Sequence, residues 1–554
     1  MYYTRSVYFF LLLVSICSKA QVYSPLDYGL KGAKNGFERF AAIKKCHEEA
    51  VHNNGIVSYE GIDTIYLDIP KGAESIPLSN ETDFSGVTMI VDNQQNDLVL
   101  FLLKRKCEDV LVRKEALKKG SKHAESVGKG LELLLVEDQN PWVAERKGYG
   151  HKVIRRDMFL LNDGVLQNEP IQGYGTKASM PEAQICHVDR DLKSIKNISF
   201  YRTKSSKKKT FLLRIENQYN VMVESVNAFT PEDDTKYGDA VLAIVNSVLV
   251  RLKDIRIDGS YSQVDSYGYG ISMNNVCDVV IDKMYGHAKW GIFYVSNAQQ
   301  ITLKDCDLNR FDLHCYGKDF TMKNCNFTGR PNAYGSLYGK LIHEGCTFNG
   351  SDAIGLRQDY NANTPFDAVF KNCIFNMTES ANCIIRFNHI SDEINQRPEL
   401  SRKSLPNLFI RNCRVNLGQD VKRWFLVVTG KIGYKDPFDG MALYDIKGLD
   451  VYGDKPFDLF SSPFSTTNPA KITFKNTYIH EPSGSKKKLM IRKATFGDGI
   501  RVNCNGKDVS QIVYIFGQKA ENVVTASLFG SAIILIAVGV LQWYNSKRKK
   551  LLYV

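Results

Sequence analysis

Imidazole, phenol and guanidinium side chains recur between residues 312 and 388, at positions that alternate with apolar residues. Alternation along a strand places successive side chains on opposite faces, so the apolar residues indicate the buried face. In FDLHCYG, this rule points Leu313 and Cys315 inward and leaves the other side chains outside. The predicted exterior positions on four successive strands are His314 and Tyr316, Tyr338 and Lys340, Arg357 and Asp359, and Arg386 and Asn388.

This set of side chains suits β-elimination of an acidic polysaccharide. A cation neutralises the uronate carboxylate and acidifies the neighbouring C–H, a base removes that proton, and an acid protonates the leaving glycosidic oxygen. Arg357 and Arg386 are the candidate cations, because planar guanidinium groups bind carboxylate or sulfate bidentately. His314 is the candidate base, and Tyr316 or Tyr338 is the candidate acid.

Other polar and aromatic residues border these candidate catalytic positions. The segment GHAKWG enters from the side, one turn before the first of the four strands, and Phe293 and Tyr294 follow it as a possible sugar platform or as core. The predicted substrate-binding residues are His287, Lys289, Trp290, Lys340, Asp359, Asn388 and His389. A single outward residue of these types is more often an ordinary surface residue, so the prediction depends on the set as a whole.

A repeated phrase signals the elements that must position these side chains. Five segments place a cysteine after a short alternating strand, and they read ITLKDCDL, FTMKNCNF, LIHEGCTF, AVFKNCIF and LFIRNCRV. Strand-length repeats at this spacing predict a solenoid whose repeats stack on one another. Equivalent positions then lie about 4.8 Å apart. We therefore expect a ladder of small buried thiols rather than disulfides. The five cysteines are Cys306, Cys325, Cys346, Cys373 and Cys413.

The N-terminal segment predicts one amphipathic helix followed by two short strands. FERFAAIKKCHEEAV has helical spacing of apolar residues, with Phe40, Ile43, Ala50 and Val51 among them, and GIVSYEG and TIYLDI follow as strands. The order of Asp27-Tyr28-Gly29, Gly32, the helix, Gly55 to Tyr59, Gly61 and Tyr66 resembles the N-terminal cap of pectate-lyase-like right-handed parallel β-helices of the polysaccharide lyase type.

The resemblance implies an all-β fold, a right-handed parallel β-helix with an N-terminal capping helix and a C-terminal β cap. This family includes lyases of the chondroitinase B type, which use a lysine and an arginine. The resemblance thus permits a sulfated glycosaminoglycan such as chondroitin or dermatan sulfate as the substrate, and pectin-like uronans remain open.

Both ends of the chain read as targeting segments. Residues 1–20 predict a signal peptide, because a basic residue and an apolar run are followed by a small-x-small cleavage motif, Ser-Lys-Ala. An uncharged stretch over 523–544 is long enough to cross a bilayer, and the basic tail at 545–554 orients it with the C-terminus in the cytoplasm. Between them we expect a β-helix over 21–430 with insertions at about 92–202, then closing rungs or a β cap over 431–518. The protein is therefore predicted to be exported and membrane-anchored.

Two other functions remain open from the sequence. A glycoside hydrolase on the same fold would need paired carboxylates, and the exterior offers only Asp312, Asp352 and Asp359. A cell-surface glycan-binding β-helix without catalysis is the second alternative, because fold does not determine function. Acids are too sparse for a calcium site, and no Cys/His spacing indicates zinc, so we expect no cofactor.

The expected partner is an acidic polysaccharide. The formal net charge is +12, and basic runs such as KSSKKK favour anionic partners. No nucleic-acid-binding module is recognisable. A monomer is expected.

Overall fold

The computed structural model describes a large part of the chain. The described residues are 20–95, 97–121, 129–138, 144–146, 151–172, 182–203, 208, 210–230, 241–259, 269–288, 291–350, 352–357, 360, 366–379, 381–388, 406–428, 443–453, 455, 457–460, 470–480, 482, 484, 486–488, 500–504 and 507–508. Within these ranges no helix is long and apolar enough to cross a membrane. The predicted membrane segment, the basic tail and all of the signal peptide except residue 20 lie outside them.

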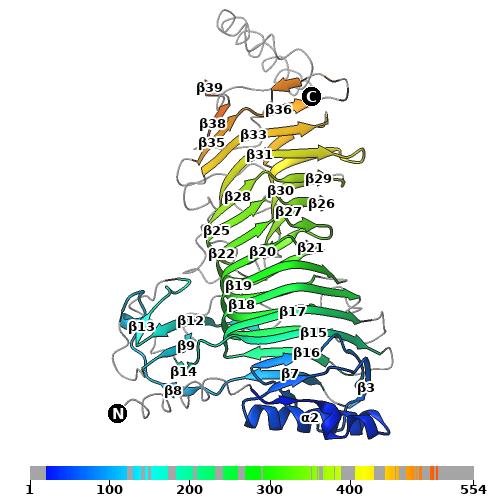
Figure 1. Ribbon diagram of the computed structural model, residues 1–554. Coiled ribbons are helices and arrows are strands. Elements are labelled where there is room, and N and C mark those ends of the chain that lie inside the picture. Colours follow the sequence, from blue (N-terminus) through cyan, green and yellow to red (C-terminus); the bar gives the residue numbers. More distant parts are fainter. Residues whose placement is uncertain are drawn as a thin grey trace, which may run out of the picture.

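The body of the protein is a column of stacked parallel strands (Figure 1). Its first rungs contain β1 (Val22–Tyr23), β2 (Ile56–Ser58), β3 (Thr64–Asp68), β4 (Ile76–Pro77), β5 (Glu81–Asp83), β6 (Thr88–Asp92) and β7 (Leu98–Lys104). The central rungs contain β15 (Lys193–Arg202), β16 (Thr210–Glu216), β17 (Tyr219–Thr230), β18 (Leu242–Gly259), β19 (Ile271–His287), β20 (Phe293–Lys304), β21 (Asp307–Leu308), β22 (Phe311–Lys323), β23 (Asn326–Phe327), β24 (Asn332–Tyr334), β25 (Leu337–Glu344), β26 (Thr347–Gly350), β27 (Asp352–Arg357), β28 (Asp367–Lys371), β29 (Ile374–Met377), β30 (Ala381–Asn388), β31 (Asn407–Leu417) and β32 (Arg423–Val428).

Pairing between successive rungs is parallel, with shifts of register between β20 and β22 and between β22 and β25. Ile271 of β19 pairs with Phe293 of β20, which pairs with Phe311 of β22, and all three side chains are buried in one continuous core. This stacking is the solenoid that the repeats predicted, and its parallel strands agree with the β-helix that the resemblance implied.

The repeated cysteine phrase marks one corner of each rung. The residue before each cysteine has a positive φ, between 51° and 67°. Left-handed backbone is favourable for glycine and tolerated by asparagine and aspartate, which explains why these positions read Asp, Asn, Gly, Asn and Asn. The five corner residues are Asp305, Asn324, Gly345, Asn372 and Asn412.

The predicted thiol ladder is confirmed. All five repeat cysteines are buried and free. Each thiol donates to a backbone carbonyl of a neighbouring strand or its own corner, as Cys346 Sγ does to the oxygen of Met322 at 3.3 Å and Cys373 Sγ to that of His343 at 3.3 Å. These thiols therefore satisfy backbone carbonyl groups near the corners of the solenoid, and their side chains face its interior.

The N-terminal end is covered by helix α2 (Gly36–His52), after two short 3-10 turns, η1 (Pro25–Tyr28) and η2 (Leu30–Gly32). Asn35 begins α2, because its side chain accepts a hydrogen bond from the backbone N–H of Glu38 at 2.9 Å. Phe40, Ile43 and Ala50 are buried as expected. The prediction for Val51 is wrong, since it is 42% exposed on the far face of the helix.

An inserted domain, residues 107–188, packs against the side of the column (Figure 1). It contains β8 (Glu108–Val110), η3 (Lys114–Ala116), β9 (Leu131–Asp138), β10 (Ala144–Arg146), β11 (His151–Val153), β12 (Arg155–Asn162), β13 (Val165–Leu166) and β14 (Glu182–Val188). Five of these strands form an antiparallel sheet in the order β13-β12-β9-β14-β8, with its own apolar cluster. A Cys107–Cys186 disulfide, which the sequence did not predict, joins the two ends of the insertion.

The last rungs lie in the stretch expected to close the solenoid. They contain β33 (Leu443–Tyr452), β34 (Phe457–Phe460), β35 (Ala470–Lys475), β36 (Tyr478–His480), β37 (Lys486–Lys488), β38 (Ile500–Cys504) and β39 (Lys507–Asp508). β33, β35 and β38 continue the parallel stack, whereas β36–β37 and β38–β39 are antiparallel pairs. Such hairpins end a solenoid by giving its open edge a partner.

Candidate functional site

His314 lies at an irregularity in the stacking of β20 on β22. Val295 pairs with Leu313, but the next residue, Ser296, pairs with Cys315, so one extra residue is accommodated at His314. Bulges of this kind re-aim side chains and are frequent next to functional sites. Leu313 points into the core as predicted. The inward prediction for Cys315 is wrong, because after the extra residue it joins an apolar cluster under the inserted domain.

Three tyrosine rings surround the imidazole of His314. The ring of Tyr294 lies edge-on at 4.4 Å between centroids, Tyr360 lies tilted at 4.7 Å, and Tyr269 lies edge-on at 5.7 Å. Tyr294 is the outward neighbour of two core residues on β20, and burial raises the pKa of its phenol. The imidazole is thus held in one orientation by aromatic contacts.

A chain of polar contacts runs from His314 into the strand. The phenol oxygen of Tyr269 lies 3.0 Å from Nε2 of His314 and donates to Oδ2 of Asp312 at 3.0 Å. Arg310 donates to the other oxygen of Asp312 at 2.7 Å. Asp312 is fully buried, so these hydrogen bonds supply the solvation that its carboxylate lacks. Tyr269 therefore connects a fixed negative charge to an imidazole nitrogen.

Arg357 joins this cluster from two rungs away. Leu313 pairs with Tyr334, which pairs with Leu356, so His314, Gly335 and Arg357 follow one another in the next row. The guanidinium carbon of Arg357 lies 4.4 Å from the ring centre of Tyr360. The order Arg357, Tyr360, His314 and Tyr294 forms a contiguous stack of side chains on the exterior of the column.

Gly335 makes room for this stack. A Cβ built on it would lie 1.6 Å from the carbonyl oxygen of His314 and 2.8 Å from Cβ of Tyr360. Backbone atoms cannot move out of the way of such a contact without shifting a strand. Glycine is therefore required at the position between the His314 and Arg357 rungs.

Arg386 lies on the same face but is committed to a neighbouring acid. Its guanidinium forms two hydrogen bonds with Asp352, through Nε and, at 2.9 Å, through Nη2. Burial lowers the pKa of Arg386, but the hydrogen bonds to Asp352 outweigh it and raise the pKa overall. Cys383 also donates to Asp352 at 3.0 Å. The predicted substrate fork is thus an ion pair within the protein.

The sequence predicted that Tyr316 and Tyr338 lie on an exposed exterior. This prediction is wrong, because the inserted domain covers both residues. Tyr316 is fully buried at a corner with φ of 57°, and its hydroxyl donates to Asp157 of the insertion at 3.2 Å. The hydroxyl of Tyr338 donates to Gln172 at 3.2 Å, and burial raises its pKa to about 12. Tyr269, rather than either of them, provides the phenol next to His314.

None of the remaining predicted residues has a described contact with the His314 cluster. Nε2 of His287 lies 3.2 Å from Asp307, and the imidazole stacks on Tyr285. Lys340 is an exposed residue of β25. Asn388 ends β30. The predicted residues Lys289, Trp290, Asp359 and His389 lie outside the described residues.

The sequence reasoning missed Tyr269, Arg310 and Tyr360. Tyr269 lies in Gly-Tyr-Gly, which reads as a turn, and Tyr360 follows a strand end with no periodicity to place it. Phe293 and Tyr294 are adjacent aromatic residues, and strand alternation separates the buried Phe293 from the outward Tyr294. In the described part of the chain, no three His, Cys, Asp or Glu side chains are placed to hold a metal ion.

No family model matches the chain, and no curated protein matches its sequence. Several solved structures resemble its backbone fold at low sequence identity. The tailspike protein of Pseudomonas phage LKA1 is 11% identical, with 86% of this chain and 84% of that chain covered at a TM-score of 0.47. The tailspike of Acinetobacter baumannii bacteriophage AP22, solved with a capsular saccharide, is 7% identical over 87% and 79%, with a TM-score of 0.43. An exopolygalacturonase from Thermotoga maritima is 9% identical over 90% and 96%, with a TM-score of 0.30.

The His314 cluster has the parts of an acid–base site. An imidazole nitrogen and a phenol oxygen lie within hydrogen-bond distance, and a guanidinium group stacks two rungs away. Such an arrangement can remove a proton, return one to a leaving oxygen and neutralise an anion.

Proposed function

We propose that the protein cleaves an acidic, uronate-containing polysaccharide by β-elimination at His314. The observation that carries the proposal is the 3.0 Å contact between the Tyr269 phenol and Nε2 of His314 on the exterior of the solenoid. A base and an acid within one hydrogen bond of each other are what removal of a proton and departure of a neighbouring oxygen require.

The reaction assigns one role to each group. Arg357 neutralises the uronate carboxylate, which acidifies the C–H at C5. His314 takes this proton, the electron pair of the C–H bond forms the C4–C5 double bond, and the C4–O bond breaks. Tyr269 donates its proton to the leaving glycosidic oxygen and regains one from the protonated His314, so the enzyme returns to its initial state.

The buried Asp312 supports this exchange. Its carboxylate accepts from Tyr269 and Arg310, so it holds the phenol in place while the proton of Tyr269 moves. Asp312 is fully buried and cannot itself contact a polysaccharide. We therefore regard it as a positioning residue.

A hydrolase mechanism on the same face has less support. Hydrolases of this kind use two carboxylates that flank the glycosidic bond. The two described acids of the face, Asp312 and Asp352, are each bound by an arginine and almost completely buried. Neither is presented to a substrate as a general acid or as a nucleophile.

The proposal places the protein outside the cell, attached to the membrane by its C-terminal segment. The Cys107–Cys186 disulfide supports export, because disulfides persist in oxidising compartments. Fractionation of cells expressing the full chain, with and without residues 523–554, tests the anchor. A full chain recovered in the soluble cytoplasm would contradict it.

The test of the activity is a panel of uronate polysaccharides, including chondroitin sulfate, dermatan sulfate and polygalacturonate. Product is followed by the ultraviolet absorbance of the unsaturated uronate. We expect turnover on one of these substrates and a loss of about 10²-fold or more in kcat for His314→Ala and Arg357→Ala. His480→Ala is the matched control, since His480 also contacts an aspartate and stacks on a tyrosine, but in the last rungs. Binding without any unsaturated product would favour a non-catalytic glycan-binding protein.

A further inference from the structure

A second exterior row of side chains runs along the column beneath the inserted domain. Strand pairing aligns Val248, Cys277, Gln299, Lys318 and Tyr338 on five successive rungs. Val248 and Cys277 pack against apolar residues of the insertion, and Tyr338 contacts Gln172 of the same domain. The row changes from apolar to polar at Gln299 and Lys318, in the middle of a covered surface.

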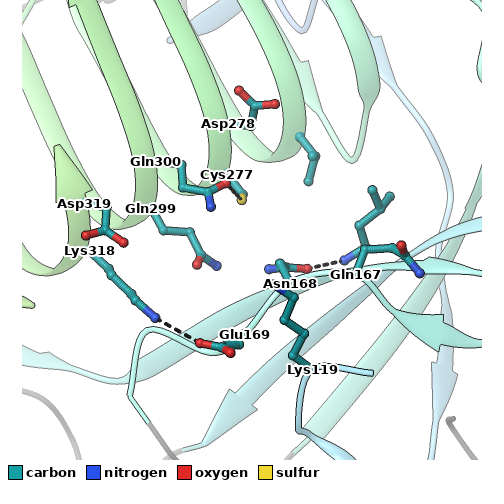
Figure 2. A pocket seen from close by; sticks show the side chains of 12 residues that line it. Lys119, Gln167, Asn168, Glu169, Cys277, Asp278, Gln299, Gln300, Lys318 and Asp319 are labelled. Carbon is teal, nitrogen blue, oxygen red and sulfur yellow. Dashed lines mark hydrogen bonds and ion pairs between the residues drawn. The ribbon is translucent and has the colours of Figure 1, made fainter. Parts of the chain in front are cut away.

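A cavity of about 280 Å³ lies at this change (Figure 2). The column contributes Gln299 and Lys318 to its wall, and the loop after β13 contributes Asn168 and Glu169. The loop is held rigidly, because the Asn168 side chain accepts from the backbone N–H of Leu160 and donates to the oxygen of Met158, both at 2.8 Å. The wall opposite the column is thus preformed.

Gln299 is the buried side chain whose amide faces the cavity. It is only 5% exposed, and its amide points into the cavity in Figure 2. Within the described residues, its amide has no hydrogen-bond partner on the protein. An amide in this position is stabilised by a ligand that both accepts a hydrogen bond from its N–H and donates one to its oxygen.

The charges around the cavity exclude a simple anion site. Lys318 lies 3.7 Å from the carboxylate of Glu169 and also donates to the oxygen of Pro170 at 3.4 Å. Asp278 is paired with Arg251 at 3.1 Å. Three carboxylates and two lysines line the space, namely Glu169, Asp278, Asp319, Lys119 and Lys318. An anionic ligand would meet more negative than positive groups.

Covalent chemistry is equally unsupported in the cavity. The thiol of Cys277 lies in its wall, but burial raises the pKa of this thiol to about 12, so it stays protonated and is a poor nucleophile. The remaining wall combines donors and acceptors with the apolar side chains of Leu160 and Val248. This combination suits a molecule that carries hydroxyl groups on an otherwise apolar ring.

We propose that this cavity binds a single neutral sugar unit, with the Gln299 amide hydrogen-bonding two adjacent hydroxyl groups. Its volume is close to the lower end of ligand pockets, which span about 300–1,000 Å³, so it fits one ring rather than a chain. The site is separate from the His314 cluster, because the residues that line the cavity include none of the cluster. The inference therefore does not depend on catalysis at His314.

The experiment uses the full chain with glucose, galactose and N-acetylgalactosamine, and with maltotriose as a neutral chain. Saturation-transfer NMR and calorimetry measure binding to the wild type, Gln299→Leu and Lys318→Met. We expect at least one neutral sugar to bind and both variants to weaken it about tenfold or more. Gln184→Leu is the control and leaves the affinity unchanged, because Gln184 lies on β14, does not line the cavity and donates to Asp109 within the insertion.

The arms of the experiment separate the possible outcomes. Binding of a monosaccharide supports the proposal, whereas binding of maltotriose alone contradicts a site that fits one ring. The proposal is overturned if no neutral sugar binds. It is also overturned if Gln299→Leu and Lys318→Met both fold and both keep the affinity of the wild type. A loss of turnover in His314→Ala with unchanged sugar binding shows that the two sites are independent.

Discussion

The phenol oxygen of Tyr269 lies 3.0 Å from Nε2 of His314, although 45 residues separate them in the chain. The same oxygen lies 3.0 Å from the buried carboxylate of Asp312. One hydroxyl group therefore contacts both a titratable ring and a fixed charge, on the rung where the strand register shifts. This relationship distinguishes the His314 face from the ordinary polar exterior of a solenoid.

Removal of the Tyr269 hydroxyl tests whether this phenol is the acid. We expect Tyr269→Phe to lower kcat about 10²-fold or more and to change KM little, because the ring contacts with His314 remain while the proton donor is lost. Tyr452→Phe is the control, since Tyr452 stacks on His480 in the last rungs. Full activity in Tyr269→Phe would assign the acid to another group.

Gly335→Ala tests the close approach of the rungs at His314. The new Cβ would lie 1.6 Å from a backbone oxygen, so we expect a loss of roughly 1–3 kcal/mol in the free energy of unfolding and a displaced His314. Urea denaturation and turnover measure the two effects. Gly32→Ala, where a Cβ would meet nothing within 4 Å, should change neither. Unchanged stability in Gly335→Ala would mean that the strand spacing is wrong.

Substitution of Arg386 tests whether this residue has a structural role or binds the substrate. Arg386→Met leaves the nearly buried Asp352 without its main partner, so we expect a loss of about 3 kcal/mol in stability. The double variant Arg386→Met with Asp352→Leu removes both charges and should recover most of this loss. Activity should return with stability. A stable double variant without activity would restore the interpretation of Arg386 as a substrate ligand.

His343 makes stability depend on pH. It occupies the interior position that Leu303, Met322, Phe370 and Ile410 hold in the other repeats, and neither ring nitrogen has a hydrogen-bond partner in the described structure. Burial lowers the pKa of His343 from 6.5 to about 4. Between these values the unfolded chain binds more protons than the folded one, so this contribution to stability is complete above pH 6.5 and falls as the pH falls toward 4.

His343→Phe removes this dependence. Burial of the neutral histidine lowers the free energy of unfolding of the wild type by about 2 kcal/mol at pH 5 relative to pH 7. The variant lacks this loss, so its free energy of unfolding should rise by about the same amount relative to the wild type between pH 7 and pH 5. Phe370 already stacks on this position at 5.0 Å, which favours an aromatic replacement. Unfolding curves of both proteins at pH 7 and pH 5 give the difference. A constant difference between the two pH values would rule out titration of His343.

The repeats predicted the solenoid because they carry local information. The corner residues before Cys306, Cys325 and Cys346 need a positive φ, which only a few residue types adopt easily, and the cysteines after them need a small buried side chain. Each requirement concerns neighbours in the chain. Alternation likewise placed Leu313 and Leu337 in the core correctly.

The prediction of the site failed where distant segments meet. Strand alternation could not anticipate the extra residue at His314, which turns Cys315 away from the core. It also could not show that residues 107–188 fold back over Tyr316 and Tyr338, because the contacts join positions more than 150 residues apart. The predicted face therefore contained His314 and Arg357, whereas the insertion contacts Tyr316 and Tyr338, and Tyr269 supplies the phenol next to His314.

The period of the strands and the backbone requirements of single residues are enough to predict the parallel stacking, the buried thiol ladder and the presence of His314 and Arg357 on one exterior face. The folded arrangement is needed to see that Tyr269 reaches His314, that Asp352 pairs with Arg386, and that a cavity remains at Gln299. Those outcomes depend on which surfaces cover one another, and burial between segments far apart in the chain leaves no periodic signal in either of them.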